Sequence, residues 1–550
     1  MLEATTTQPE DLHQLLFGST NPVGGLPEDE PLLIDAHNTD RFYTFSDLRN
    51  NVRAFAHAIL GPSFNLKQRD VVSICSPNDI EYYAAFHGTI AAGCIACPLR
   101  AFMTSDEIAA LFHISNPKLI IGHPSTVQLL QDALKSYGKE LPVLVMATTE
   151  APAGTQLFSD FLKPTERQQE PLPSISPESP SHLLCTSGTT GAYKLVSTSH
   201  DIEVQRTLLM QLGGDQPFFA GKKEVNVLTC GNFGSSHNII SSQLSWIYGR
   251  IRQYITDSMD EEVILRYLSK YKCITPNMLP SFVVARLVDR VEQLKQAGDE
   301  SLDLSSLRII GSVGQPLDPK VIQRASKVLP GTFVVLIFGS TESGFMFMPT
   351  IDGGYPTYEG KYTREGDDRF EFKLVDENGQ VVPRGCQGEL LFRSPMIIKE
   401  YYNNPEKTAE SFDKEGFFRT SDIFVMDEHD KVHWLGRSSE RIKTSNKPVV
   451  PKPIEDLCMA FGGIKDCAVV GAFSKKRVYE LPTAYIVLED DNHQDKEKLA
   501  EAVARFVNER VPDEDSRLTG GVKVIPELPR THVGKVNRFK LRQWAQDDIE

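Results

Sequence analysis

The sequence has no long hydrophobic run, no excess of basic residues and no cysteine framework. No apolar run approaches the roughly 20 residues that cross a membrane, and the first ten residues lack the positive start and apolar centre of a signal peptide. The 58 Lys and Arg against 73 Asp and Glu give a net charge of −15. This charge argues against nucleic acids and anionic membranes as partners, because both bind basic faces. The chain also lacks a C-terminal Ser-Lys-Leu peroxisomal signal, so we expect a cytoplasmic protein.

The nine cysteines are irregularly spaced, which indicates free thiols in a reducing compartment. Cys94 and Cys97 form a close pair, but they lie in an apolar stretch with no second pair nearby. They are therefore expected to be buried thiols, not a zinc or redox site. Because single cores stop growing at roughly 250–300 residues, a chain of 550 residues should fold as more than one domain.

Short apolar runs alternate with helical patterns in the first third of the chain. Residues 71–75, 119–121 and 141–145 are typical of buried strands, and 126–136 of a helix between the last two. A further helix is expected to run to about Leu60, with Ser46 as its N-cap. Near-continuous apolar strands imply sheets covered by helices on both faces, which is an α/β fold.

The later chain divides into regions of different pattern. The spacing predicts helices over 201–213, 260–271 and 281–297, and strands over 307–310 and 332–338 that run into Gly-rich turns. Ligand sites in open α/β sheets gather at such strand ends. Alternating residues over 371–392 predict a small β subdomain. After Trp434 about a hundred residues carry their own apolar content, so we place a domain boundary there: 1–435, a hinge at 436–439, and 440–550.

Residues 186–194, Thr-Ser-Gly-Thr-Thr-Gly-Ala-Tyr-Lys, have the composition of a phosphate-binding loop. Gly188 and Gly191 let the backbone turn amide N–H groups toward an anion, and hydroxyls and the Lys194 ammonium add donors. A Walker P-loop is excluded, because its lysine directly follows the last glycine. In isolation such a loop could also be a Ser/Gly-rich surface turn.

The loop closely resembles the Ser/Thr-Ser-Gly-Thr-Thr-Gly-x-Pro-Lys signature of the adenylate-forming superfamily, with Tyr193 in place of proline. This superfamily comprises acyl- and aryl-CoA ligases, luciferases and peptide-synthetase adenylation domains. Residues 338–342, Phe-Gly-Ser-Thr-Glu, resemble its Tyr-Gly-x-Thr-Glu motif, and 528–538 match its Pro-Arg-Thr-x-x-Gly-Lys-x-x-Arg motif. Residues 311–317 resemble the wall of its adenine pocket, and 419–422 stand where it has Thr-Gly-Asp.

The resemblance implies a role for each matched residue. Phe338 would stack on adenine, Thr341 would contact the α-phosphate and Glu342 would hold Mg²⁺. Asp422 would accept the ribose hydroxyls, Arg437 would contact ribose or phosphate, and Lys535 would be the catalytic lysine, with Thr341 and Glu342 also catalytic. The residues to which the resemblance assigns ATP or AMP binding are Thr186, Ser187, Gly188, Thr189, Thr190, Gly191, Lys194, Gly314, Gln315, Pro316, Phe338, Gly339, Ser340, Thr341, Asp422 and Arg437.

The acyl pocket implied by the resemblance contains Phe233, Gly234, His237, Gly311 and Phe345. Relatives that activate amino acids have aspartate at the position of Gly234, and many CoA ligases have histidine there. Glycine supplies neither a carboxylate to hold a substrate ammonium nor an imidazole, so an α-amino acid is disfavoured as substrate. His237 is the candidate for the missing imidazole, against the alternative of a structural or solvent-facing histidine. The apolar run 345–348 favours an aromatic or fatty acid, unless it is simply core.

Three further positions depart from the family pattern. Ser421 replaces the glycine of Thr-Gly-Asp, Ser439 replaces the usual hinge aspartate or lysine, and Asn446 replaces a glycine that lines the pantetheine tunnel in many CoA ligases. The region 445–455 also resembles fungal carboxylate-reductase-type adenylation domains, which pass the acyl group to a carrier protein.

The resemblance implies an α/β fold with a large N-terminal domain of stacked α/β subdomains plus a β subdomain, and a small mobile α+β C-terminal domain. It implies ATP- and Mg²⁺-dependent activation of a non-amino-acid carboxylic acid, followed by transfer to CoA, by a monomer or homodimer. Two alternatives stay open: a stand-alone adenylation enzyme that loads a separate carrier protein, and a nucleotide-binding protein that has lost turnover.

Overall fold

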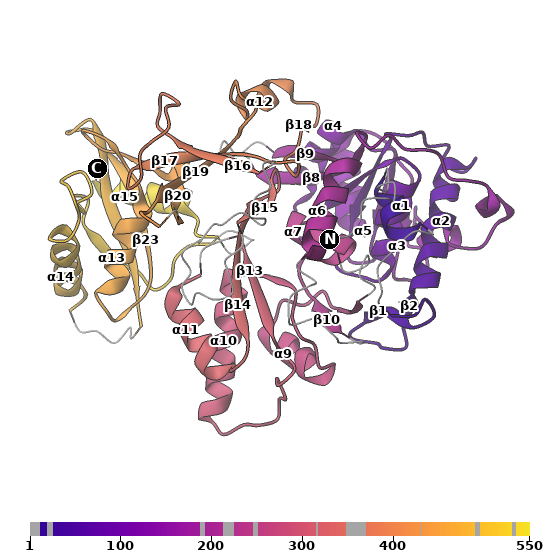
Figure 1. Cartoon of the computed structure of the whole chain (residues 1–550), viewed down its shortest axis with the longest axis horizontal. Helices are drawn as coiled ribbons and strands as arrows, with labels where there is room; N and C mark the ends of the chain where they lie inside the picture. Colours follow the sequence, from indigo (N-terminus) through magenta and orange to yellow (C-terminus); the bar gives the residue numbers. More distant parts are fainter. Residues whose placement is uncertain are drawn as a thin grey trace. The chain divides into compact units, whose positions relative to one another are not determined.

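A computed structural model describes residues 11–18, 26–187, 193–212, 225–245, 251–314, 317–347, 370–429, 431–489, 495–530 and 535–549. The chain forms two compact units (Figure 1). Unit 1 contains the described residues up to 347 together with 394–410, and unit 2 contains 370–393 and the residues from 411 onward. The predicted hinge at 436–439 stays a prediction.

The largest sheet of unit 1 has eight strands. Its order is β18 (Glu400–Tyr401), β9 (Tyr193–Ser199), β8 (Pro180–Ser187), β4 (Ile95–Leu99), β3 (Val71–Cys75), β5 (Leu119–Gly122), β6 (Val143–Val145) and β7 (Gln156–Leu157). The pairs among β3 to β7 are parallel, and β8 pairs with β9 antiparallel. The strand β6 begins only after Pro142, because proline has no N–H to give to a sheet ladder.

Both faces of this sheet are buried, as the near-continuous apolar strands predict. Val72 and Ile74 of β3 lie in one core cluster with residues of α2 (Phe45–Leu60) and α3 (Glu81–Ala91). Val71 and Cys75 lie in another cluster with residues of α4 (Ser105–Ser115) and α5 (Val127–Tyr137). Alternate residues of a strand point to opposite faces, so each strand contributes to two cores.

The predicted N-cap Ser46 is wrong. The side chain of Thr44 accepts the N–H of Asp47, and the Asp47 carboxylate accepts the N–H of Thr44 in return. This reciprocal capping box needs an acceptor three residues after the cap, which Thr44 has in Asp47. The helices predicted over 126–136, 201–213, 260–271 and 281–297 are confirmed to within two residues as α5, α6 (His200–Leu212), α9 (Glu261–Lys270) and α10 (Ser281–Gln296).

Two smaller sheets complete unit 1. One has the order β10 (Asn226–Thr229), β11 (Arg252–Ile255), β1 (Pro31–Asp35), β2 (Phe42–Thr44), and the other β12 (Met278–Pro280), β13 (Ile309–Val313), β14 (Phe333–Ser340), β15 (Gly344–Phe347). The strands β13 and β14 extend further than predicted, so Gly311, Gly339 and Ser340 lie inside strands and not in the turns after them, while Phe338 lies within the strand predicted for it. The remaining helical segments are α1 (Leu12–Phe17), η1 (Phe158–Phe161), η2 (Glu166–Gln169), α7 (Ser236–Asn238), the π-helix η4 (Ile239–Ser245), α11 (Pro319–Val328) and α12 (Pro405–Glu410).

Unit 2 contains the β subdomain predicted near 371–392, which is an antiparallel sheet of β16 (Glu371–Val375), β17 (Gln387–Arg393), β19 (Phe418–Met426) and β20 (Val432–Arg437). It also contains a sheet of β23 (Ile464–Ser474), β24 (Tyr479–Leu488) and β25 (Val522–Val524). Its other elements are η5 (Ser438–Glu440), β21 (Ile442–Lys443), β22 (Pro448–Val449), α13 (Pro451–Ala460), α14 (Lys496–Asn508) and α15 (Arg538–Ile549).

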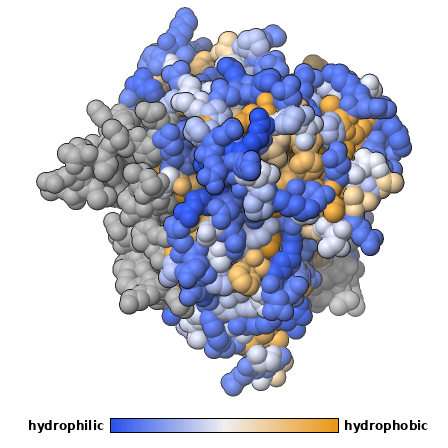
Figure 2. Space-filling model, turned by 90° about the vertical axis from the view of Figure 1, so that its right-hand side faces the viewer, coloured by the Kyte–Doolittle hydropathy of each residue, from blue (hydrophilic) through white to orange (hydrophobic). Residues whose placement is uncertain are grey.

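All nine cysteines are free thiols, and Cys94 and Cys97 are both fully buried, as predicted. In the described part of the chain, no helix is both long and apolar enough to cross a membrane. On the face shown in Figure 2, hydrophilic residues predominate and hydrophobic ones form small groups among them.

Candidate active site

The predicted phosphate loop connects two paired strands. In the register of β8 and β9, Thr186 lies opposite Lys194, and Ser187 opposite Tyr193. The loop residues Gly188, Thr189, Thr190 and Gly191 lie outside the described residues. Tyr193, which stands where the family has proline, donates its phenol hydrogen to Glu107 of α4. Its side chain thereby ties one end of the hairpin to a helix.

Lys194 lies close to Tyr401 and to Glu342, the predicted Mg²⁺ ligand. Its Nζ is 5.8 Å from the centre of the Tyr401 ring. Burial and the charge of Lys407 lower the pKa of Lys194, while Glu342 opposes that change. Because the hydroxyl of the same Tyr401 donates to Glu342, the phosphate hairpin and the predicted Mg²⁺ ligand lie in one neighbourhood of unit 1.

The predicted catalytic residues Thr341 and Glu342 occupy the turn between β14 and β15. Phe338 is buried and lies opposite Phe347, and Gly339 lies opposite Phe345. A Cβ at Gly339 would be 2.1 Å from the carbonyl oxygen of Gly344, so only glycine fits there. The backbone of this hairpin is therefore packed too closely to admit a side chain at the second residue of the motif.

The side chains of the turn have defined partners that lie outside the sequence motifs. Glu342 Oε1 accepts a hydrogen bond of 2.9 Å from the Tyr401 phenol, and Thr341 Oγ1 is 3.3 Å from Ser236 Oγ. Ser340 is linked to Ser343 by hydroxyl and backbone hydrogen bonds. Tyr401 reaches the site because β18 pairs with β9 of the phosphate hairpin. No local sequence signal could have indicated this, since Tyr401 is 59 residues from Glu342.

Glu342 offers a carboxylate to a magnesium ion. Across the described ranges, no group of three or more His, Cys, Asp or Glu side chains could hold a metal ion. A single carboxylate still fits Mg²⁺ beside ATP, because this ion usually takes one or two carboxylates and completes its shell with substrate phosphates and water.

Gly234 lies where the backbone of another strand leaves no room. A Cβ there would be 2.9 Å from the carbonyl oxygen of Leu99, at the end of β4, and 2.9 Å from Asn232 Oδ1. The aspartate or histidine that relatives have at this position could not be accommodated without moving the backbone. Position 234 therefore needs glycine because the backbone of Leu99 lies against it.

The segment before Gly234 is held by Asn78, which the sequence did not single out. Asn78 Oδ1 accepts the N–H of Phe233 at 3.1 Å, and its Nδ2 donates to the carbonyl oxygens of Gly231 and Thr256 at 2.6 and 3.0 Å. His237 is half-buried, and its Nε2 lies 3.2 Å from Asn238 Nδ2. The ring of His237 is therefore engaged within its own loop, and its role in place of the missing imidazole stays a prediction.

The predicted acyl-pocket residues Gly311 and Phe345 belong to one small apolar region. Phe345 is buried in a cluster with Ile240, Val313 and Ile337. Met278 lies opposite Gly311 in the β12–β13 pair, and a Cβ at Gly311 would be 2.6 Å from its sulfur. The predicted adenine-wall residue Gly314 has a φ of 85°, while Gln315 and Pro316 lie outside the described residues.

The remaining predicted residues lie in unit 2. Asp422 is buried, and its Oδ1 accepts hydrogen bonds from Trp434 Nε1 at 2.9 Å and lies 3.0 Å from Arg437 Nε. Burial raises the pKa of Asp422 to about 6, although Arg437 and Trp434 act in the opposite direction. Lys535 is exposed, and its charge also favours the ionised carboxylate of Asp422. The predicted ribose acceptor and the predicted catalytic lysine thus influence each other within one unit.

The three departures in unit 2 have different structural consequences. Ser421 has a φ of 59°, the left-handed conformation that glycine adopts freely. Ser439 lies in η5, and its carbonyl oxygen accepts from Arg542. Asn446, together with Thr444 and Ser445, donates to the carboxylate of Asp515. The segment 444–446, in which Asn446 replaces the family's glycine, is therefore held by Asp515.

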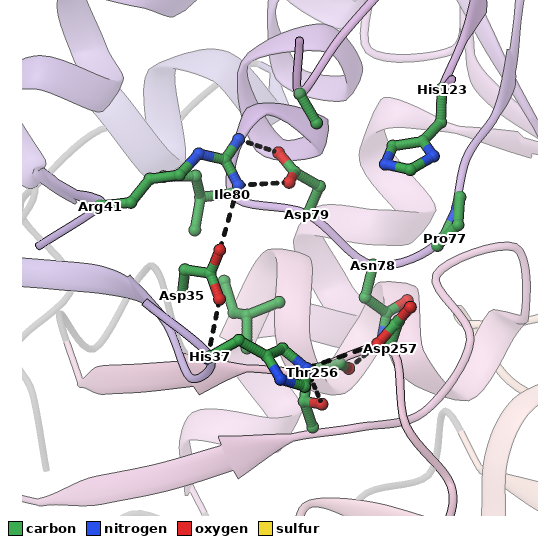
Figure 3. A pocket seen from close by; sticks show the side chains of 12 residues that line it. Asp35, His37, Arg41, Pro77, Asn78, Asp79, Ile80, His123, Thr256 and Asp257 are labelled. Atoms are coloured by element: carbon green, nitrogen blue, oxygen red, sulfur yellow. Dashed lines mark hydrogen bonds and ion pairs between the residues drawn. The ribbon is translucent and has the colours of Figure 1, made fainter. Parts of the chain in front are cut away.

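A polar cavity of about 240 Å³ lies elsewhere in unit 1, at the carboxyl ends of β1, β3, β5 and β11 (Figure 3). Arg41 points at the carboxylates of Asp35 and Asp79, and His37 at Thr256 and Asp257. None of the residues predicted for catalysis or binding lines this cavity. Its charged side chains are paired with each other within the wall, so we assign it no ligand.

Two protein-family models match this chain, in addition to individual proteins and solved structures that resemble it. The model of the AMP-binding enzyme family matches residues 23–402, and that of the AMP-binding enzyme C-terminal domain matches residues 453–535. The chain is 26% identical over 517 residues to 4-coumarate–CoA ligase from Vanilla planifolia, covering 93% of this chain and 90% of the relative. It is 27% identical over 535 residues to 4-coumarate–CoA ligase 1 from Petroselinum crispum, covering 96% and 93%. Its fold matches the crystal structure of ATP-bound MatB from Rhodopseudomonas palustris with a TM-score of 0.82 at 22% identity, covering 98% of this chain and all of that one.

Proposed function

Since this chain belongs to the AMP-binding enzyme family, we propose that it activates a non-amino-acid carboxylic acid with ATP and then transfers the acyl group to CoA. In the first step a carboxylate oxygen attacks the α-phosphorus of ATP and pyrophosphate leaves. In the second step the CoA thiolate attacks the acyl carbonyl and AMP leaves. The enzyme is thus an AMP-forming acid–thiol ligase.

The observation that carries the proposal is the meeting of two predicted motifs in unit 1. Tyr401 contacts Glu342 through its hydroxyl, and its ring lies beside the ammonium of Lys194. A lysine from the phosphate hairpin and a carboxylate that Tyr401 holds at one oxygen suit a magnesium-bound polyphosphate. Since two anions must meet in the first step, catalysis here is chiefly neutralisation of charge.

The other groups have complementary tasks. Mg²⁺ bound at Glu342 would neutralise phosphate charge. Thr341 donates its hydroxyl to the α-phosphate, and Lys194 pairs with the outer phosphates. Asp422 accepts the ribose hydroxyls, and Lys535 reaches the carboxylate and the α-phosphate together. In this proposal residues 440–550 form a lid that turns about 436–439, so that one lid position serves each half-reaction.

We propose an aromatic acid as the first substrate to test. Gly234 leaves no charged group to hold a substrate ammonium, and Phe345 and its neighbours offer an apolar wall. Both relatives described above carry the name 4-coumarate–CoA ligase. Medium- and long-chain fatty acids are the next candidates.

The test is pyrophosphate release from Mg-ATP over a panel of aryl, medium-chain and long-chain acids, each with and without CoA. Turnover that requires CoA and yields the thioester by mass spectrometry supports the proposal. A single burst that is indifferent to CoA indicates a separate carrier protein as acceptor, and silence across the panel indicates a nucleotide-binding protein without turnover. In the active case, Lys535→Ala should lose acyl-AMP formation while ATP binding persists, and Glu342→Ala should abolish turnover or raise the Mg²⁺ requirement.

A further inference from the structure

Arg206 of α6 is a charged side chain in the interior of unit 1, only 2% exposed. Its NH1 donates to Glu203 Oε1 at 2.8 Å, and its Nε donates to the carbonyl oxygen of Met396 at 3.0 Å. Its NH2 donates to the carbonyl oxygens of Glu342 at 3.2 Å and of Thr341 at 3.5 Å. The guanidinium therefore holds the main chain of the two residues to which the proposed function assigns the phosphate and the metal.

The charge of Arg206 is balanced inside the protein. Glu203, one turn earlier on α6, is fully buried. Burial raises the pKa of Glu203, and the adjacent Arg206 opposes that change. His182 Nε2 lies 3.7 Å from Glu203, but burial and the charge of Arg206 lower the pKa of His182 to about 3, so it is neutral. The guanidinium is thus paired with one carboxyl group, and its remaining donors are available to carbonyl oxygens.

The turn is held from two directions. The carbonyl oxygen of Glu342 accepts the N–H of Ile398 at 2.9 Å as well as the NH2 of Arg206. Gly344 has a φ of 66°, and a Cβ there would be 2.9 Å from Arg206 Nε, so the backbone lies directly against the guanidinium. These contacts engage the main chain, while the side chains of Thr341 and Glu342 meet Ser236 and Tyr401.

We propose that Arg206 is a positioning residue for the Thr341–Glu342 turn, and this inference rests on the proposed function. Arg206 touches no substrate. It places the hydroxyl of Thr341 and the carboxylate of Glu342 relative to the phosphate hairpin. Lysine could not replace it, because a compact ammonium lacks the planar fork of donors that serves Glu203, Met396 and the turn at the same time.

The sequence alone could not reveal this role. A single arginine in a helix is usually a solvated surface residue. The partners of Arg206 on the turn and in the 394–398 segment are 136 and 190 residues away. Arg206 can position the β14–β15 turn only because the folded chain brings α6 next to it.

Two variants and one control test the proposal. Arg206→Lys keeps the charge and loses the fork. The double variant Glu203→Gln with Arg206→Met removes both buried charges together, since a single deletion would leave the other charge buried and unpaired. Thr207→Val is the control, because Thr207 is buried on the same helix and its hydroxyl has no hydrogen-bond partner in the described structure.

The measurements are thermal unfolding, kcat and KM for the acid, and calorimetric titration of ATP with and without Mg²⁺. We expect Arg206→Lys and the double variant to fold, with kcat lowered on the order of 10- to 100-fold, because misplacement by about 1 Å can cost that much. KM for the acid should change little, and the gain in ATP affinity that Mg²⁺ confers should shrink several-fold. Thr207→Val should behave as wild type.

Each other outcome has a definite meaning. Lower thermal stability with unchanged kcat and unchanged Mg²⁺ effect on ATP binding would show a merely structural ion pair and overturn the proposal. The same holds if neither variant folds, since the pair would then be needed for the fold itself. If the wild type is silent on every acid, the proposed function fails. The Mg²⁺-dependent ATP titration still decides the role of Arg206 in that case.

Discussion

The phenol of Tyr401 donates a hydrogen bond of 2.9 Å to Oε1 of Glu342. Tyr401 is buried against Val196 and Ile398. This packing fixes the position of its ring and therefore that of its hydroxyl. A fixed donor selects one orientation of the carboxylate and leaves its other oxygen for a further ligand. The pairing of β18 with β9 places Tyr401, and Tyr401 in turn fixes the orientation of the Glu342 carboxylate.

Replacement of Tyr401 by phenylalanine should preserve the packing and remove only this donor. We expect kcat for pyrophosphate release to fall roughly tenfold, equivalent to about 1.4 kcal/mol of activation free energy, with KM for the acid unchanged. Steady-state kinetics of the purified variant measure this. Tyr402→Phe, at the adjacent residue that packs against a different core cluster, should stay within about twofold of wild type. Equal effects of the two variants would remove Tyr401 from the site.

Addition of a side chain at Gly234 should be destabilising. The methyl group of Gly234→Ala would press on the Leu99 carbonyl oxygen, and overpacking of this kind costs about 1–3 kcal/mol. Denaturant unfolding should show that loss, and Gly234→His should lose at least as much. A stable, more active Gly234→His variant would contradict the conclusion that the backbone of β4 excludes the histidine of related CoA ligases.

Replacement of Ser421 by glycine should stabilise the protein. A left-handed φ of 59° costs an L-residue about 1–2 kcal/mol, and the greater freedom of glycine in the unfolded chain offsets about 0.4–1 kcal/mol of the gain. We expect a net increase of up to about 1.6 kcal/mol in the free energy of unfolding, measured in urea. Ser421→Ala keeps the Cβ and should give no such increase. If alanine and glycine act alike, the conformation of residue 421 is not strained.

The affinity for ATP should depend on pH through Asp422. Its pKa in the free protein is raised to about 6 by burial, so the carboxyl is largely protonated below that pH and ionised above it. Two ribose hydroxyls donate best to the ionised form, which means that ATP binding lowers this pKa and releases a proton. Affinity should therefore decline as pH falls through about 6.

Calorimetric titration between pH 5 and 8 measures this dependence, because proton release alters the binding heat in buffers of different ionisation enthalpy. Asp422→Asn cannot ionise, so its affinity should be lower above pH 6 and should lack the Asp422 component of the pH dependence. The ATP phosphates also titrate in this range, and comparison of the two proteins removes their common contribution. Identical pH profiles for both proteins would exclude Asp422 from the ribose site.

The residue pattern of the chain is enough to predict the α/β class, the strands β3 and β5, five helices (α2, α5, α6, α9 and α10) and the β subdomain near residue 371. These depend on periodicity and on turn residues, which are local properties of the chain. The family resemblance likewise came from contiguous motifs. The errors are local too: Thr44 and not Ser46 is the cap, because Thr44 has the acidic partner three residues on, and β13 and β14 continue into the Gly-containing segments predicted to be turns.

The support of the site becomes visible only when the chain is folded. Asn78 holds the segment at Phe233, Tyr401 orients Glu342 and Arg206 carries the turn, and these partners are separated by 155, 59 and 136 residues. Gly234 was visible in the sequence as a departure, but its cause is the approach of the Leu99 backbone. Hydrogen bonds and steric contacts between distant segments leave no periodic trace along the chain, because either partner alone looks like an ordinary polar or small residue.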